Sequence, residues 1–193
     1  MDTSLLLKEF QARTNITSEE FEQYLALCEP RRFKKNEIIM QAGDIPKFTL
    51  FVVSGCLRQY YVSAEGVERI IYFAEERWWA GDLLSMRNGT PTELNLQALE
   101  ATDTLTISKE NWEYAFKNFP WYAELHIKGQ QRWNGKMQNQ LGQSLADSPE
   151  TKYLRLLKER PKLLQRVPQY HIATYLGITP ETLSRIRKKI SLK

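Results

Sequence analysis

The sequence has few of the side chains from which metal centres, disulfide frameworks and catalytic sites are built. Its 193 residues include 2 cysteines, Cys28 and Cys56, and 2 histidines, His126 and His171. The cysteines have no metal-site spacing and lie among apolar neighbours, so we expect buried free thiols. One chain cannot supply four thiolates to an iron–sulfur cluster, and neither histidine falls in the β-rich middle of the chain, where a barrel metalloenzyme would need several. We therefore expect no metal, no cofactor and no enzymatic activity, with His126 packing or hydrogen-bonding locally.

Long apolar runs are also missing. No stretch approaches 18 apolar residues, and the start MDTSLLLKEF has neither a basic n-region nor a long apolar segment, so the sequence predicts neither a membrane span nor a signal peptide. With 42% hydrophobic and 26% charged residues, the chain resembles an ordinary globular protein of one or two domains. We expect a cytoplasmic protein.

Positive charge is concentrated at one end of the chain. Residues 150–193 contain 11 Lys and Arg against 3 Asp and Glu, a net charge of +8, whereas the first 149 residues contain 16 against 20, a net charge of −4. A basic block is often only a solvated face, but on a folded helical segment it also suits contact with phosphate backbones.

Helical and strand signals follow one another in blocks. We expect the first 30 residues to be helical, with one helix around Ser4 to Ala12 and one after Thr17, where Glu20 completes a capping box. From Phe33 to Ser108, segments such as FTLFVVSG and ERIIYFAE are rich in β-branched and aromatic residues and are separated by glycines. They predict a β-sandwich or barrel of short strands.

Helical patterns return after Ser108 and include one long segment, from about Pro120 to Ala146. Four large apolar side chains recur there every four residues: Trp133, Met137, Leu141 and Leu145. Glycines at 129, 135 and 142 would each weaken an isolated helix by about 1 kcal/mol. The helix therefore needs a partner surface, which is either the chain's own barrel or a second copy. ADSPET then indicates a hinge, with Asp147 or Ser148 capping a helix that begins at Pro149.

The stretch GITPETLSRIRKK, Gly177 to Lys189, predicts the second helix of a helical hairpin. Thr179 can cap a helix that begins at Pro180, and Gly177 suits a left-handed turn after a first helix from Gln169 to Tyr175. One face of the second helix is apolar, with Leu183, Ile186 and Ile190, and the other is polar. This pattern fits an ordinary αα-hairpin or a DNA-binding helix-turn-helix, and the basic charge favours the second.

For a DNA-binding role, each polar side chain of the second helix has an expected task. Arg185 and Glu181, one turn apart, are expected to contact base edges. Contacts with phosphates are expected from hydroxyls near the helix N-terminus and from cations toward its C-terminus, namely Thr179, Thr182, Ser184, Arg187, Lys188 and Lys189.

The order of these parts resembles the Crp/Fnr family of bacterial transcription regulators over nearly the whole chain. The residues that carry the resemblance are FKKNEIIMQAGD (Phe33 to Asp44), LFVVSGCLRQY (Leu50 to Tyr60) and IATYLGITPETLSRIRKK. The resemblance implies an α+β protein with an antiparallel β-roll effector domain at 1–118, a dimerisation helix at 119–147 and a helix-turn-helix domain at 148–193. It also implies a homodimer that binds double-stranded operator DNA, with RNA polymerase as a further candidate partner.

Two departures from the family pattern limit what the resemblance implies. Where nucleotide-binding members have a Gly-Glu pair and then an Arg-Ser or Arg-Thr pair, this chain has Gly81 and Asp82, then Thr92 and Glu93. Because Glu93 would repel a phosphate, we expect an unknown effector other than cyclic AMP. The pocket candidates are Arg58, Gly81, Asp82, Leu83, Thr92 and Glu93. The sequence also ends soon after the second helix, so we expect the family's wing of two strands to be reduced or absent.

Two alternatives stay open at this stage. The chain could be an effector-binding or protein-interaction module that has lost sequence-specific DNA binding. The aromatic residues of the β-rich segment either line an apolar ligand pocket or fill the core: Tyr60, Tyr61, Tyr72, Phe73, Trp78 and Trp79.

Overall fold

The computed structural model describes residues 4–191, with the side chains of Leu5, Ser144 and Leu145 left out of the description. The chain divides into two compact units. One, the roll unit, comprises the residues up to Tyr61 together with Ile71–Gln130, and the other, the helical unit, comprises Val62–Ile70 together with the residues from Gln131 onward.

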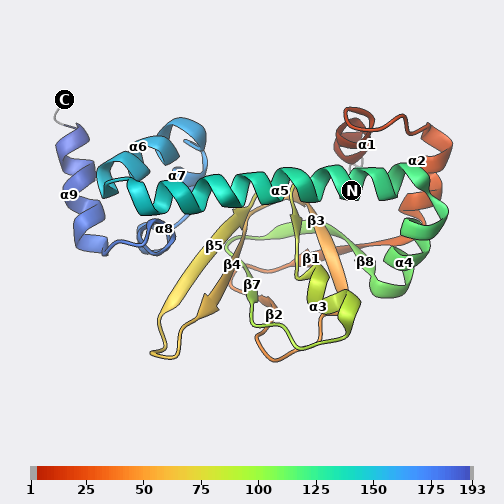
Figure 1. Ribbon diagram of the computed structural model, residues 1–193, viewed down its shortest axis with the longest axis horizontal. Coiled ribbons are helices and arrows are strands. Elements are labelled where there is room, and N and C mark those ends of the chain that lie inside the picture. Colours follow the sequence, from red (N-terminus) through yellow and green to blue (C-terminus); the bar gives the residue numbers. More distant parts are fainter. Residues whose placement is uncertain (1–3, 192–193) are drawn as a thin grey trace. The chain divides into compact units, whose positions relative to one another are not determined.

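Two four-stranded sheets form the β-roll (Figure 1). The first has the order β1 (Cys28–Phe33), β8 (Thr102–Ser108), β3 (Phe48–Ser54) and β6 (Trp79–Ala80). The second has the order β2 (Ile38–Met40), β7 (Asn95–Ala98), β4 (Leu57–Val62) and β5 (Glu68–Ala74). The expected α+β class and antiparallel roll are confirmed.

The central strands of the first sheet are buried on both faces. Phe51 and Leu105, opposite each other in the β3–β8 ladder, belong to a core shared with the N-terminal helices. Leu50 and Val52 alternate with Phe51 and therefore point to the opposite face, and both are fully buried. Leu57 of the second sheet is equally buried. The roll thus has one core between its sheets and a second core under its helices.

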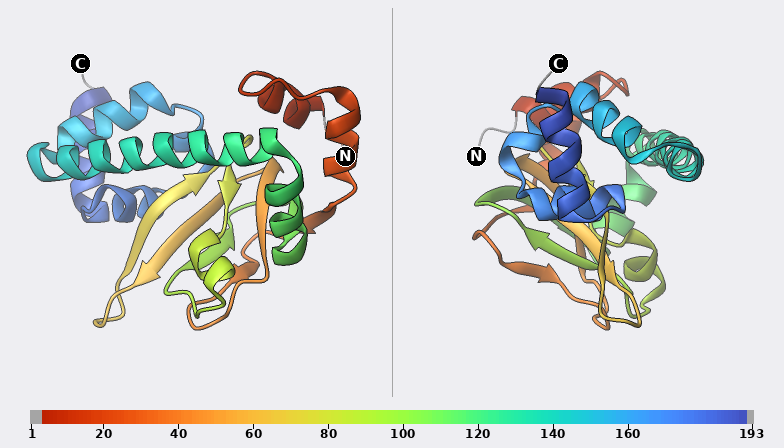
Figure 2. Two further views of the ribbon diagram at one scale, coloured as in Figure 1. Left: turned by 45° about the vertical axis from the view of Figure 1, so that its right-hand side comes forward. Right: turned by 90° about the vertical axis from the view of Figure 1, so that its left-hand side faces the viewer.

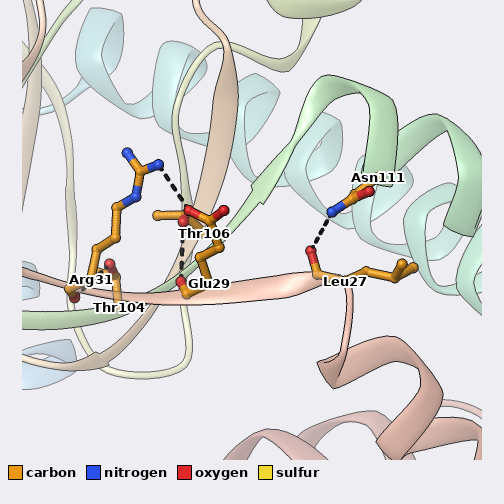
Figure 3. A network of polar contacts seen from close by, with 6 residues as sticks. All are labelled: Leu27, Glu29, Arg31, Thr104, Thr106 and Asn111. Carbon is orange, nitrogen blue, oxygen red and sulfur yellow. Dashed lines mark hydrogen bonds and ion pairs between the residues drawn. The ribbon is translucent and has the colours of Figure 1, made fainter.

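β1 lies at the edge of the first sheet and is protected there by its sequence. Side chains from β8 and from α4 (Lys109–Asn118) donate to backbone carbonyl groups of β1 and of Leu27 just before it (Figure 3). Thr104 donates to Arg31 O at 3.1 Å, Thr106 to Glu29 O at 3.1 Å, and Asn111 to Leu27 O at 2.8 Å. Pro30 has no N–H, and four of the six residues of the strand are exposed. Proline and charge on an edge discourage pairing with another chain.

The helices of the roll unit are α1 (Ser4–Gln11), α2 (Ser18–Leu25), α3 (Leu83–Asn88), α4 (Lys109–Asn118) and the first part of α5 (Pro120–Ala146). The predicted capping box is confirmed, since Glu20 N–H donates to Thr17 Oγ1 at 3.2 Å and Thr17 N–H donates to Glu20 Oε2 at 2.9 Å. Ser108 caps α4 as expected. The expectation of helix throughout the first 30 residues is wrong at its end, because β1 begins at Cys28.

Both cysteines are free thiols, as predicted, with Cys56 buried and Cys28 half-buried. Burial raises the pKa of Cys28 to about 11, so this thiol stays protonated and unreactive at neutral pH. None of the helices within residues 4–191 is long and apolar enough to cross a membrane.

Gly55 is required where β3 turns into β4. Its φ is +106°, and a β-carbon at this position would lie 2.4 Å from Thr102 Oγ1 and 2.7 Å from Thr102 Cα. A side chain therefore fits neither the backbone conformation nor the space. This glycine allows the hairpin to pass directly over β8.

The helical unit contains the second half of α5, α6 (Pro149–Glu159), the short α7 (Leu163–Arg166), α8 (Gln169–Leu176) and α9 (Pro180–Ser191). α6, α8 and α9 pack against one another in pairs, as Figure 2 shows for the blue helices. Of the two expected caps for α6, Ser148 serves, accepting from Thr151 N–H at 3.2 Å. Within the described chain, which ends at residue 191, no strand follows α9.

Candidate functional site

The turn between α8 and α9 forms as the sequence predicts. Gly177 takes a left-handed conformation with φ of 70°. Its N–H donates to Thr174 O at 3.2 Å, and the N–H of Ile178 donates to Ala173 O at 3.0 Å. These two bonds form a Schellman motif, which ends α8. The Thr182 N–H then donates to Thr179 Oγ1 at 3.2 Å, which caps α9 at its N-terminus.

α9 has a buried face and an exposed face, as the pattern predicts. Leu183 and Ile186 are buried and Ile190 is half-buried. The exposed residues of the helix are Pro180, Glu181, Ser184, Arg185, Arg187, Lys188, Lys189 and Ser191. The structure therefore brings the predicted DNA-facing side chains together on one solvent-facing surface, apart from Thr182, which is half-buried.

Arg185 and Glu181 lie one helical turn apart on this surface. The guanidinium of Arg185 donates to Thr182 Oγ1 at 3.3 Å. The pKa of Glu181 is lowered, first by its own backbone N–H, then by the Thr179 hydroxyl and the charge of Arg185. Glu181 is therefore ionised at neutral pH. Both side chains lie within the first two turns of the helix.

Lys189 differs from the other predicted phosphate contacts. Its ammonium group donates to Glu150 Oε2 of α6 at 2.7 Å, so it joins α9 to α6. Glu150 lies 39 residues away in sequence, and no local pattern could have predicted this pair. Arg187 and Lys188 are the exposed cations of the C-terminal half of α9 that have no such bridge among the described contacts.

The predicted effector pocket forms a turn whose polar groups bind one another. Asp82 caps α3, accepting from Ser85 N–H at 3.1 Å, and its other oxygen accepts from the Thr92 hydroxyl at 2.8 Å. Thr92 is only 2% exposed. Burial alone would raise the pKa of Asp82, but these hydrogen bonds outweigh it and lower the pKa overall. Glu93 points to solvent, and Leu83 and Gly81 are half-buried beside Asp82.

Arg58, the cation among the predicted pocket residues, already has partners within the chain. It is 5% exposed, its Nε donates to Gln97 Oε1 at 2.7 Å, and its guanidinium lies 4.0 Å from the centre of the Tyr60 ring. Arg87 lies 5.3 Å from the centre of the Trp112 ring. Arg58 therefore joins β4 to β7. None of the described contacts links it to Asp82.

The aromatic residues of the roll divide between core and surface. Tyr60, Tyr72 and Phe73 are buried, Trp78 and Trp79 are half-buried, and Tyr61 is exposed. Tyr72 donates its hydroxyl to Gln59 Oε1 and stacks on Trp78 with 6.2 Å between ring centres. Core packing accounts for most of this set.

His126 packs locally, as predicted. It accepts from Trp112 Nε1 at 3.2 Å, and its ring centre lies 4.5 Å from Tyr122 and 5.3 Å from Trp112. Burial, together with the nearby Arg87, lowers its pKa to about 4. Among the residues that the structure describes, no three His, Cys, Asp or Glu side chains gather as a metal site.

The predicted dimerisation stripe on α5 is only partly exposed. Trp133 and Met137 are half-buried, Leu141 is 63% exposed, and the side chain of Leu145 lies outside the described residues. Ile127, which the sequence reasoning missed, is 54% exposed. It lies 14 residues before Leu141, so a spacing of seven residues would have revealed it where a spacing of four did not.

Comparison with known proteins now identifies the fold. Residues 30–119 match the family model of the cyclic nucleotide-binding domain. Among solved structures, the c-di-GMP-responsive global regulator CLP of Xanthomonas campestris aligns with a TM-score of 0.73 at 16% identity, over 91% of this chain and 92% of that one. The chain has the Crp/Fnr fold. FixK2 of Bradyrhizobium japonicum aligns with a TM-score of 0.71 at 18% identity, over 86% of this chain and 85% of that one.

A Crp/Fnr-family protein from Eubacterium rectale is similar to the same extent, with a TM-score of 0.70 at 20% identity, over 92% of this chain and 85% of that one. No curated protein matches the sequence. The Crp/Fnr regulators are a non-enzymatic family. In this fold the roll corresponds to the cyclic nucleotide-binding domain, and α8 and α9 correspond to the helix-turn-helix.

The buried His126 predicts a pH-dependent stability. Its pKa of about 4 in the folded protein lies below the ordinary value of 6.5, so the unfolded chain binds the extra proton first and stability falls as pH falls from 6.5 toward 4. Between pH 7 and pH 5 this group should cost about 1–2 kcal/mol of unfolding free energy. Urea unfolding at both pH values would measure it.

His126→Gln is the matched variant, because glutamine can still accept from Trp112 but does not titrate. The pH-dependent loss should be smaller in this variant by the same amount. An equal loss in both proteins would contradict the assignment to His126.

Proposed function

We propose that this protein is a homodimeric transcription regulator that binds operator DNA in the cytoplasm through α9. The observation that carries the proposal is the exposed face of α9, on which Arg185 and Glu181 lie together while Leu183 and Ile186 are buried behind them. A helix held in this way can enter the major groove with its polar side toward the bases. The net charge of +8 on residues 150–193 supports contact with phosphates.

In this proposal Arg185 donates to the O6 and N7 atoms of a guanine, while Glu181 accepts from a cytosine N4 or steadies the arginine. Thr179, Thr182 and Ser184 lie near the helix N-terminus, where hydroxyls and the helix dipole favour phosphate. Arg187 and Lys188 provide charge further along the helix. Because Lys189 is paired with Glu150, we assign it to bracing α9 on α6 rather than to the main phosphate contacts.

We further propose that α5 joins two copies through the face that carries Ile127, Asn134 and Leu141. These residues are seven apart, so they lie on one side of the helix, and all three are exposed. A central asparagine between apolar residues sets register and strand number in parallel coiled coils. A β-carbon placed at Gly135 or Gly142 would meet no described atom within 4 Å, so packing inside the chain does not require glycine at these positions. The close approach of a second helix would require it.

The roll is proposed to be an effector domain whose ligand is not cyclic AMP. The cyclic phosphate needs a cation, whereas Asp82 here binds Thr92 and the exposed Glu93 adds a second negative charge. Arg58 is held by Gln97 and Tyr60.

Arg185→Ala and Lys188→Ala should separate base recognition from backbone contact. Arg185→Ala should weaken binding to the selected operator by about 1–3 kcal/mol and flatten base preference, because it removes a bidentate contact. Lys188→Ala should weaken all duplexes about equally and lower the salt slope by about one ion. Operators selected from random duplexes would be titrated with each variant over a salt series.

Lys158→Ala, an exposed lysine on α6, is the control for a general loss of charge. The proposal fails if Arg185→Ala keeps both wild-type affinity and base preference, because α9 would then be only a solvated basic face.

Replacing Ile127 and Leu141 by glutamate should produce monomers, because like charges would face each other across the proposed α5 interface. Burial of each large apolar side chain stabilises by about 1.5–3 kcal/mol, so the loss should be clear by light scattering. The control is Leu84→Glu, a change at a leucine of α3 that is 68% exposed. A double variant that stays dimeric at micromolar concentration would place the interface elsewhere.

Cyclic AMP should leave DNA affinity unchanged and should show no saturable heat in calorimetry up to millimolar concentration. The physical reason is the pair of carboxylates at Asp82 and Glu93, with no cation bound to either in the described contacts. Micromolar binding that is lost in Arg58→Gln would contradict this expectation and would make Arg58 the replacement for the missing arginine.

A further inference from the structure

A cleft of about 440 Å³ lies inside the helical unit, between the second half of α5, α6 and α8. All of its lining residues belong to this one unit. The volume falls in the range of about 300–1,000 Å³ that small-molecule sites occupy. The proposed function does not use this cleft, since neither the polar face of α9 nor the roll lines it.

Part of the cleft lining consists of apolar and uncharged polar side chains. Leu156 and Leu176 are buried, and Tyr175 is half-buried. Burial raises the pKa of Tyr175, so its hydroxyl is neutral at physiological pH. The α5 side supplies the amide side chains of Asn139 and Gln140. Such groups can hold the polar, uncharged body of a small ligand, because amides both donate and accept.

The charge of the lining is positive. Lys136, Lys152 and Arg155 contribute three cations against one carboxylate, that of Glu159. Arg155 is half-buried and uses its two terminal nitrogens separately, one on Gln143 Oε1 at 2.5 Å and one on Asp147 Oδ2. Asp147 lies just before the cap of α6 and is outside the cleft lining. The lining therefore contains two lysines from different helices and an arginine whose only anionic partner among the described contacts is Asp147.

We propose that this cleft binds a small phosphate monoester, whose phosphate lies among Lys136, Lys152 and Arg155 and whose hydroxyl-bearing body lies against the amides of α5. A phosphate monoester carries about −1.5 to −2 charges at pH 7, which matches the excess of cations better than a single carboxylate does. Arginine and lysine are the side chains that most often donate hydrogen bonds to phosphate in proteins. The bound phosphate would compete with Asp147 for Arg155 and so loosen the hinge between α5 and α6.

The first test uses glucose 6-phosphate as the probe, with glucose and gluconate as matched compounds without phosphate. Titrations of the full chain would be followed by amide chemical shifts. Glucose 6-phosphate should move the signals of Leu156 and Tyr175 in a saturable way, and glucose should not. Gluconate should bind at least tenfold more weakly. Equal binding of gluconate, or no saturable shift with glucose 6-phosphate, would overturn the proposal.

The second test separates this cleft from the basic face of α9, which could also attract a phosphate. Lys136→Gln with Lys152→Gln should weaken glucose 6-phosphate binding by about tenfold for each lost charge-assisted bond, whereas Lys158→Gln on the outer side of α6 should not. If binding instead survives the double variant and is lost in Lys188→Gln, the phosphate lies on α9 and the cleft proposal is wrong. Operator binding is measured separately, so failure here leaves the proposed DNA-binding function intact.

Discussion

Burial of Leu183 and Ile186 is the contact on which the geometry of α9, the helix that we propose to bind DNA, depends. An α-helix that turns these two side chains inward must turn the residues one half-turn away toward solvent, and in α9 those residues are Glu181, Arg185 and Lys188. The Schellman turn at Gly177 then sets where the helix begins, because a residue with a β-carbon would be strained at φ of 70°. Apolar packing thus fixes the orientation of the charged side chains, although none of the charged groups contributes to that packing.

Ion pairs in the helical unit determine which cations are engaged between its helices, and they add little to the free energy of unfolding. Lys189 is 59% exposed in its pair with Glu150, and such exposed pairs contribute little to the free energy of unfolding. Their effect is to join segments of the unit: Lys189 joins α9 to α6, and Arg155 joins α6 to Asp147, which lies between α5 and α6. A count of basic residues on α9 therefore overstates the charge that is available to an outside partner.

The sequence predicts well what depends on neighbours in the chain. The capping box of Thr17 and Glu20, the caps at Ser108 and Ser148 and the turn at Gly177 involve residues three to five apart, and all four are confirmed. The sequence analysis missed the start of β1 at Cys28, because a proline and several charged residues in CEPRRF are typical of a loop. In a strand they are tolerated at a sheet edge, which is where β1 lies. The pairs Lys189–Glu150 and Arg58–Gln97 link distant segments, so no local pattern could reveal them. The same is true of the partial burial of Trp133 and Met137, which depends on tertiary packing.

The cassette around α3 shows how the fold can be kept while the chemistry changes. The carboxylate of Asp82, a predicted pocket residue, accepts a hydrogen bond from the hydroxyl of Thr92 in the same chain. Its other oxygen caps α3 through Ser85 N–H. The loop is also closed through the backbone, since Thr92 N–H donates to Asp44 O at 2.8 Å and Gly43 N–H donates to Thr92 O at 2.8 Å. Because the turn satisfies these polar groups within the chain, its hydrogen bonds do not depend on a ligand.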